Sequence, residues 1–359
     1  MEARYKTSIF IILSAYFFVS SIVLIKSSAV ALGRSLAEAL FFLVRDTTSG
    51  VFVGWLSTAL LHSSGAFDSI IVAFVSAGVI PLRLAVAAIL GAEVGTTVTP
   101  LTISILGYIR RRSQLSASFN VSMTHFLYNL LTLILFYFLE LSLGVFTRIA
   151  EAGKGIFVKA SWLSLIPDLL ELVTPWVDLL MGLIPGWLGI IFGCFILLAS
   201  LWAFEHYMTA TFNMPRSWNL IRATFMKPLR AFIAGFIFTI LVPSTTVMVS
   251  LLVPLAASGV IGPEHYILPY ILGANIGTVF DVMMAALATG DPAALSVWLV
   301  HLSNNLVGAL IFLPLMKPFS GLVRRVSNEI SSSPWRSLLF IGTYHLIPIL
   351  IISCYILRR

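Results

Sequence analysis

Long hydrophobic runs alternate along this chain with apolar stretches that are shorter or interrupted by polar residues. A helix that crosses the hydrocarbon core of a bilayer needs about 20 apolar residues. Five runs meet this requirement, and we predict spanning helices over 8–25, 119–143, 187–204, 294–315 and 337–357. Cleavage of the first run as a signal peptide stays an alternative, although its apolar part is longer than such signals usually have.

The apolar stretch that begins at residue 51 is divided by a polar tip into two short arms. The arms cover 51–61 and 66–79, and the tip is His62-Ser63-Ser64-Gly65. At 1.5 Å per residue each arm reaches about 16 to 21 Å, which is short of the roughly 30 Å hydrocarbon core. This pattern favours a re-entrant helical hairpin over 51–79. The next run, 82–109, is long enough to cross but is broken by the segment GAEVGTT and by Pro100, so we predict a broken helix packed against protein or a wet cavity.

The second half of the chain repeats the first at a spacing of 181 residues. After one inserted residue, ILGAEVGT at 89–96 matches ILGANIGT at 271–278. We therefore predict a second hairpin over 231–260, with the tip Pro243-Ser244-Thr245-Thr246, and a second broken helix over 265–289. Further matched residues are Gly54, Thr58, Ser63 and Gly78 in the first copy and Gly235, Thr239, Ser244 and Gly259 in the second.

Basic residues lie at opposite ends of the two copies. The first copy closes at three arginines, 110–112, whereas the second opens after Arg216, Arg222, Lys227 and Arg230. Because short cytoplasmic loops collect Lys and Arg, the copies are predicted to have opposite orientations, which is the inverted-topology repeat of many secondary transporters. This orientation places the amino terminus in the cytoplasm. The two arginines at 358–359 then fall outside, which is an exception to the rule.

These elements define an all-α polytopic membrane protein with two inverted repeats, each with a re-entrant helical hairpin and a broken transmembrane helix. The first repeat is expected at 1–147 and the second at 186–316. Between them, 148–185 is expected to form short amphipathic helices at the membrane interface as a linker. Residues 317–359 hold the last spanning helix. The expected location is the cell membrane, inner or plasma, with several passes.

Composition agrees with a chain whose main solvent is lipid. Hydrophobic residues make up 59% of the 359 residues and charged residues 10%, whereas soluble chains are about 25% charged. The net charge of +7 does not indicate nucleic acid as a partner, because the basic residues cluster between apolar runs instead of along one helix face. Lipid is the expected surrounding, and a homodimer is an open oligomeric state.

Hydroxyl groups at the two tips are candidates for binding an anion. The candidate residues are His62, Ser63, Ser64, Gly65, Ser244, Thr245 and Thr246. Helix amino termini attract anions through unpaired N–H groups and the helix dipole, so two facing tips would form an oxyanion cradle. The alternative is that these residues only cap the half-helices or bond neighbouring helices. Asp68 either adds to the first tip or caps its arm.

Oxygen-bearing residues of the two broken segments are candidates for binding a cation. They are Glu93, Thr96, Thr97, Thr99, Asn275, Thr278 and Asp281. Hard cations take oxygen ligands, and unwound backbone carbonyls bind Na⁺ in transporters. Ionisable groups inside a membrane are costly, so we predict a Na⁺ or proton role here over a buried structural pair.

Two matched polar pairs lie on the spanning helices that follow the broken segments. His125 with Asn129, and His301 with Asn305, are four residues apart, so each pair shares a helix face. They either line the site from the scaffold side or serve only as interhelical hydrogen bonds.

The duplicated motifs resemble the sodium-dependent phosphate cotransporter family, which includes the animal type II carriers and many prokaryotic members. Each family repeat has a G-x-x-x-T motif, a Q-S-S-S tip, an A-G pair and a G-A-N-I-G-T break, and this chain is similar in both halves. The resemblance implies Na⁺ at the tips, phosphate between them, no organic cofactor, and alternating access by a hairpin-bearing core that moves against the remaining helices.

The chain departs from this pattern at the tips and at the first break. His62 and Pro243 replace the glutamines, Gly65 and Thr246 replace the third serine, and Glu93 replaces the first asparagine. We predict a secondary carrier, not an enzyme, that moves inorganic phosphate or a similar small oxyanion with Na⁺. The alternative is a proton-coupled carrier or an exporter of another small solute. An intramembrane metalloenzyme has little support, because the chain contains no H-E-x-x-H pair.

Overall fold

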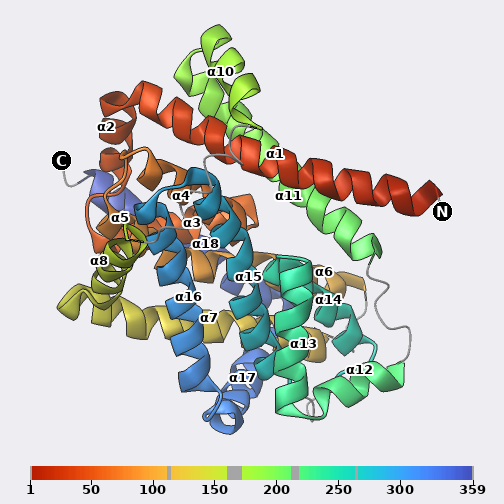
Figure 1. Ribbon diagram of the computed structural model, residues 1–359. Helices are drawn as coiled ribbons and strands as arrows, with labels where there is room; N and C mark the ends of the chain where they lie inside the picture. Colours follow the sequence, from red (N-terminus) through yellow and green to blue (C-terminus); the bar gives the residue numbers. More distant parts are fainter. Residues whose placement is uncertain (1, 111–114, 160–171, 212–217, 263–265, 358–359) are drawn as a thin grey trace.

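The computed structural model describes residues 2–110, 115–159, 172–211, 218–262 and 266–357, which form helices and turns with no strand (Figure 1). The helices of the first half are α1 (Glu2–Leu32), α2 (Arg34–Leu43), α3 (Thr47–Leu61), α4 (Ser64–Ser76), α5 (Leu82–Gly95), α6 (Val98–Arg110), α7 (Leu115–Leu143) and α8 (Val145–Phe157). Those of the second half are α10 (Thr174–Leu183), α11 (Gly186–Thr211), α12 (Trp218–Phe225), α13 (Pro228–Leu241), α14 (Thr245–Ala257), α15 (Ile267–Thr289), α16 (Pro292–Phe312), α17 (Met316–Ser331) and α18 (Pro334–Leu357).

Part of the sequence argument falls outside these residues. The orientation of the two copies rests partly on Arg111, Arg112, Arg216, Arg358 and Arg359, and the predicted linker includes 160–171; all of these lie outside the described residues. The opposite orientations and the cytoplasmic amino terminus stay predictions.

Seven helical segments of the described chain are long and apolar enough to cross a membrane. They are Thr7–Leu32, Leu82–Leu106, Ala117–Leu143, Gly186–Met208, Ile267–Thr289, Pro292–Phe312 and Pro334–Leu357. Four of the five predicted spans lie within these segments, and the span 294–315 overlaps a fifth. The prediction of an α-helical membrane protein with several passes is therefore confirmed.

Each predicted hairpin consists of two short helices. Helices α3 and α4 contain 15 and 13 residues, and α13 and α14 contain 14 and 13. At 1.5 Å per residue none of them reaches across a core of about 30 Å. Ser63 and Ser244 begin α4 and α14 as N-caps with nearly the same φ, −153° and −152°. Their re-entry into the bilayer stays a prediction.

The two copies pack their helices in the same register. In the first copy, a Cβ atom on Gly91 of α5 would lie 1.8 Å from the carbonyl oxygen of Val51 on α3. In the second, a Cβ on Gly273 of α15 would lie 2.0 Å from the carbonyl oxygen of Phe232 on α13, and Phe232 is the residue that matches Val51. The same correspondence holds for Gly54 with Gly235 and for Gly95 with Gly277. Small residues let helix backbones approach closely, so the duplication is present in packing as well as in sequence.

The first predicted break is present and the second is not. Thr96 and Thr97 form a turn between α5 and α6, whereas α15 runs without interruption through 273–278, so the prediction of a broken helix over 265–289 was wrong. Pro100 in the first turn of α6 has no N–H with which to continue the ladder of α5. The matched residue in α15 is Val282, which leaves the helix continuous.

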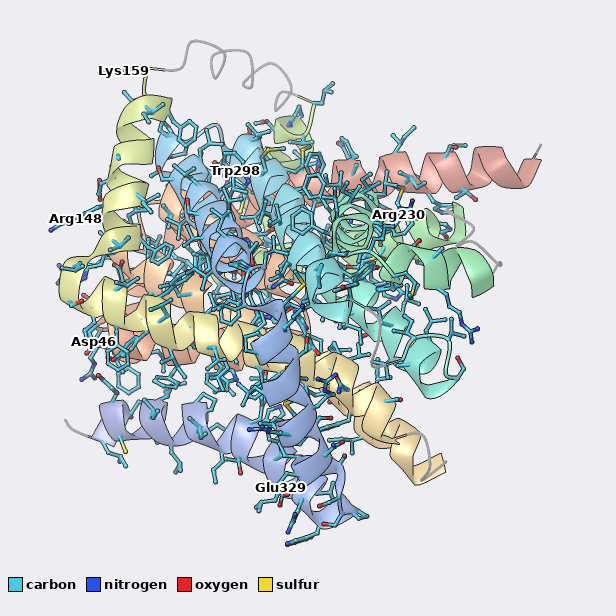
Figure 2. All side chains as sticks on the ribbon, turned by 90° about the horizontal axis from the view of Figure 1, so that it is seen from below. Asp46, Arg148, Lys159, Arg230, Trp298 and Glu329 are labelled. Carbon is cyan, nitrogen blue, oxygen red and sulfur yellow. The ribbon has the colours of Figure 1, made fainter. Side chains whose placement is uncertain are left out.

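The interior of the bundle is shared between the copies. Helices α1 and α11 lie side by side along one side of the molecule, with α10 beyond them (Figure 1). Helices α4, α5, α15 and α16 pack together. Helix α8, which contains the start of the predicted linker, packs on α16 of the other copy, and α17 packs on α7. Figure 2 shows Arg148, Lys159 and Glu329 at the edges of the bundle.

Candidate functional site

The two hairpin tips are joined through one buried threonine in the first break. The Ser64 hydroxyl donates to Thr96 Oγ1 at 3.3 Å, and the hydroxyls of Thr96 and Thr246 are 3.0 Å apart. The Thr246 hydroxyl also lies 3.4 Å from the backbone carbonyl oxygen of Thr96. All three side chains are buried. The structure thus brings together one residue from each tip and one from the predicted cation segment.

The other tip hydroxyls bond to their own half of the chain. Ser63 Oγ accepts from the N–H of Ala66 at 3.2 Å, and Ser244 Oγ accepts from the N–H of Val247 at 3.3 Å. These are N-cap bonds, and they are the capping role that the sequence left open. The Thr245 hydroxyl donates to the carbonyl of Ala274 on α15 at 3.1 Å.

His62 ends α3 in a left-handed conformation, with φ of 57°. Its ring Nδ1 lies 2.9 Å from Thr99 Oγ1 in α6. The side chain is exposed, so His62 lies at the margin of the tip and not in its buried centre. The structure pairs this residue with Thr99 across the hairpin and the break of the same copy.

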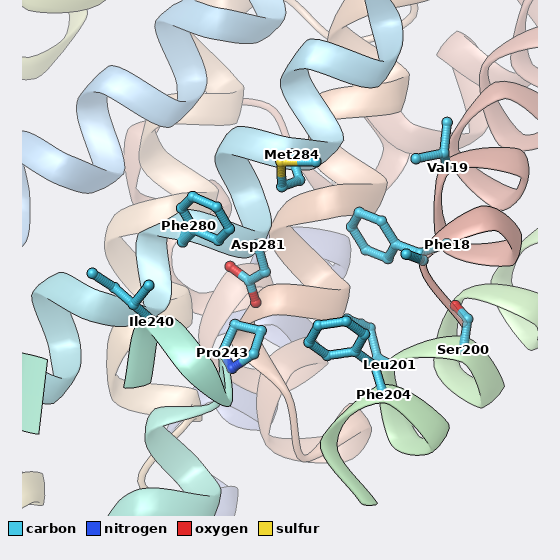
Figure 3. A pocket seen from close by; sticks show the side chains of 11 residues that line it. Phe18, Val19, Ser200, Leu201, Phe204, Ile240, Pro243, Phe280, Asp281 and Met284 are labelled. Carbon is cyan, nitrogen blue, oxygen red and sulfur yellow. The ribbon is translucent and has the colours of Figure 1, made fainter. Parts of the chain in front are cut away.

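The Asp281 carboxylate lies directly against Gly65 at the amino end of α4. A Cβ on Gly65 would be 1.8 Å from Asp281 Oδ2. The other oxygen, Oδ1, accepts from the N–H of Val282 at 2.6 Å. Asp281 also faces a cavity of about 140 Å³ whose other walls are mainly apolar and include Phe18, Leu201, Phe204, Pro243 and Met284 (Figure 3).

A charged cluster lies beside the tips and is contributed by both copies. His301 Nε2 on α16 is 2.6 Å from Glu93 Oε1 on α5, and His301 Nδ1 is 3.2 Å from Asp68 Oδ2 on α4. Asn305 donates to the same Glu93 oxygen at 3.1 Å. The three ionisable side chains are almost fully buried, so their charges must be balanced inside the protein.

The second copy contains the uncharged counterpart of this cluster. Asn275, which matches Glu93, donates to Asn129 Oδ1 of α7 at 3.2 Å. His125, which matches His301, lies beside the Asn275 side chain. Val249 stands at the position that matches Asp68. Each His/Asn pair therefore contacts the matched segment of the other copy, 91–96 or 273–278, and only one of the two resulting clusters carries charge.

The remaining predicted residues do not join the tips. The Thr97 hydroxyl donates to the carbonyl of Val94 at 2.7 Å, and Thr278 is buried on α15. Two backbone carbonyls at the first break also accept a side chain from a distant helix: the Tyr344 hydroxyl on α18 donates to the Val94 carbonyl at 2.7 Å and lies 3.1 Å from the carbonyl oxygen of Gly95. These two carbonyls already have partners within the protein, so they are not free ligands for a cation.

Two residues at the site were missed in the sequence. Tyr344 belongs to α18, which lies outside the duplicated segments, so no repeat match marks it. Glu205 on α11 lies beside Ser244 at the second tip. The only signal for Glu205 was a carboxyl group near the end of an apolar run, where ionisable residues are rare.

Comparison with known proteins adds a family to this geometry. The family model described as Na⁺/Pi-cotransporter matches residues 17–158 and 196–328. The uncharacterized protein YqeW of Bacillus subtilis is 24% identical over 315 residues, which cover 87% of this chain and 84% of that protein. Sodium-dependent phosphate transport protein 2A of Ovis aries is 24% identical over 388 residues, which cover 83% of this chain and 59% of that protein. Sodium-dependent phosphate transport protein 2B of Homo sapiens is 23% identical over 427 residues, which cover 88% and 60%. The chain thus spans about 60% of the length of these two animal proteins. No solved structure matches the chain.

Proposed function

Because the chain belongs to the Na⁺/Pi-cotransporter family, we propose that it is a secondary active carrier that moves inorganic phosphate or a similar small oxyanion together with Na⁺. The family and the names of the relatives support sodium-coupled phosphate transport for the family as a whole. The substrate of this chain and its mode of access to the two sides of the membrane are parts of the proposal.

One observation carries the proposal: the chain of hydroxyl contacts from Ser64 through Thr96 to Thr246. It joins the starts of two helices that come from different copies. Both helix starts offer N–H groups and a favourable dipole for an anion, which is why their convergence supports an oxyanion site. Hydroxyl and carboxylate oxygens around it, including Asp281, would serve Na⁺ as hard ligands.

Alternating access is proposed as a movement between two parts of the bundle. One part is the core that bears the hairpins and α15, and the other contains the remaining long helices. The cavity beside Asp281, between α1 and α11 on one side and the second tip on the other, supports this division. A seam of this kind can open without breaking the glycine-mediated packing of α13 on α15.

The test is uptake of labelled phosphate into proteoliposomes with and without an inward Na⁺ gradient. The wild type should accumulate phosphate only with the gradient. Thr96→Val removes the hydroxyl that joins the tips and should lower uptake at least about tenfold, since losing a buried hydrogen-bond partner costs about 1–3 kcal/mol. Thr102→Val is the matched control, because the Thr102 hydroxyl bonds only the carbonyl of Val98 in its own helix. If the wild type takes up no phosphate either with or without the Na⁺ gradient, phosphate is refuted as the substrate.

Proton coupling is the second candidate, and the Asp68–His301–Glu93 cluster favours it. Carboxylate and histidine groups buried inside a membrane are the usual parts of proton pathways. Uptake driven by a pH gradient at equal Na⁺ on both sides, with no response to a Na⁺ gradient, would replace Na⁺ by H⁺ in the proposal.

A further inference from the structure

A departure from the family pattern and a buried carboxylate meet at one point of this structure. Gly65 stands at the position of the third serine in the Q-S-S-S tip of the family, and Asp281 approaches it from α15. Because a Cβ at position 65 would lie 1.8 Å from Asp281 Oδ2, no side chain fits there while the carboxylate is in place. The carboxylate of one copy thus occupies the space that a tip side chain of the other copy would fill.

This exchange changes the hydrogen-bonding character of the tip. A serine hydroxyl both donates and accepts, whereas an ionised carboxylate only accepts. Asp281 Oδ1 accepts a hydrogen bond from the N–H of Val282, and Asp281 Oδ2 faces the amino end of α4. Among the described residues that bond at the tips, none is Lys or Arg, so an anion there would meet a carboxylate and no basic side chain.

We propose that Asp281 makes the anion site selective for oxyanions that carry a proton, such as phosphate and arsenate, over sulfate. This inference rests on the proposed transport function. At neutral pH phosphate keeps at least one P–OH group, which can donate to Asp281 Oδ2 while its other oxygens accept from the hydroxyls and N–H groups of the tips. Sulfate has no proton to donate, so two acceptors would face each other without a bond.

The size of the discrimination follows from the same argument. A site built to hydrogen-bond a substrate OH rejects an analogue without it by about 10⁴ to 10⁵ when the site is fully buried. Asp281 is buried, but it borders a cavity and so is not enclosed by protein on every side; we therefore expect a smaller preference, of at least about 100-fold, for phosphate over sulfate.

The experiment measures how much sulfate is needed to halve labelled phosphate uptake into proteoliposomes at fixed pH and saturating Na⁺. Asp281→Asn restores a donor, and Asp281→Thr copies Thr99, the matched residue of the first copy. Both variants should lower the sulfate excess required at least about tenfold and should admit labelled sulfate. Glu151→Gln, which removes an exposed carboxylate on α8, should leave the excess unchanged.

The outcomes separate the possibilities. A variant that still transports phosphate and excludes sulfate as the wild type does overturns the inference. A shift only in the half-saturating Na⁺ concentration also overturns it, and leaves Asp281 with the proposed cation role alone. A wild type without phosphate uptake refutes the proposed function. If the single variants do not transport, protection of the purified protein from thermal unfolding by phosphate and by sulfate gives the same comparison. The double variant Gly65→Ser with Asp281→Thr places a serine side chain in the space that the Asp281 carboxylate leaves. If sulfate protects this variant from thermal unfolding no better than it protects the wild type, the result counts against the inference.

Discussion

The buried Asp68–His301–Glu93 cluster gives the sharpest stability prediction. His301→Gln removes the group that lies 2.6 Å from Glu93 and 3.2 Å from Asp68, and it leaves two carboxylates facing each other at a site where the histidine and Asp68 side chains are 0% exposed. Removing one partner of a buried ion pair costs about 3–5 kcal/mol, because the remaining charge is left without compensation.

That cost can be read as a melting temperature. Unfolding entropy of about 2.1 cal/mol/K per residue gives roughly 0.75 kcal/mol/K for 359 residues, so the change should lower the midpoint by about 4–7 °C. Circular dichroism of the purified protein in detergent measures this shift. His345→Gln is the matched control, since the His345 ring bonds only the carbonyl of Ile341 in its own helix, and it should shift the midpoint by about 1 °C or less.

The second copy supplies the decisive comparison. Asp68→Val with Glu93→Asn gives the first cluster the residues of the second, Val249 and Asn275, and keeps the histidine. Both carboxylates are then absent, so the double variant should be destabilised by less than His301→Gln although it changes more atoms. The reasoning about uncompensated charge is wrong if His301→Gln has the same melting midpoint as the wild type. It is also wrong if the midpoint of the double variant is lower than that of His301→Gln.

Three further predictions follow from the packing of the break and the repeats. Gly91→Ala and Gly273→Ala should each lower the melting midpoint by several degrees, because the new Cβ would lie 1.8–2.0 Å from a carbonyl of the facing helix, whereas Gly321→Ala, with open space, should not; equal midpoints would contradict this. Tyr344→Phe should cost about 1–3 kcal/mol in thermal unfolding, because the carbonyls of Val94 and Gly95 lose the Tyr344 hydroxyl and only Val94 keeps its bonds from Thr97; an unchanged midpoint would mean that water replaces the hydroxyl. Pro100→Val should extend α5 into α6 as in α15, withdraw Thr96 from the tips and abolish uptake in proteoliposomes while the protein stays folded; undiminished uptake would show that the break is dispensable.

Sequence reasoning reached the elements but not the contacts between the copies. Hydrophobic run lengths predicted the spans, and the repeat predicted two short-armed hairpins with Ser63 and Ser244 at equivalent positions, because N-cap chemistry and helix length are local properties. The prediction of a second break was wrong because the GANIGT segment was expected to have the same backbone as the matched GAEVGT segment. Pro100, which interrupts the helical hydrogen bonds of the first copy, has no proline counterpart in α15.

The contacts between the two copies could not be predicted from the sequence. Nothing in the spacing of His301 and Asn305 indicates that they approach Glu93 of the other copy, and the closeness of Gly65 to Asp281 depends on how α4 packs against α15. Tyr344 was invisible for a different reason: the capping of a broken helix by a side chain of a distant helix depends only on the final packing.

The cross-copy origin of the charged cluster has a consequence for biosynthesis. Asp68 and Glu93 leave the ribosome 208 or more residues before His301. At about 5–20 residues per second, the two acids spend roughly 10 to 40 seconds in the nascent chain before their counter-charge exists. During that interval the two acids have no histidine beside them, so the buried packing of α4 and α5 around this cluster is complete only after the second half has been made.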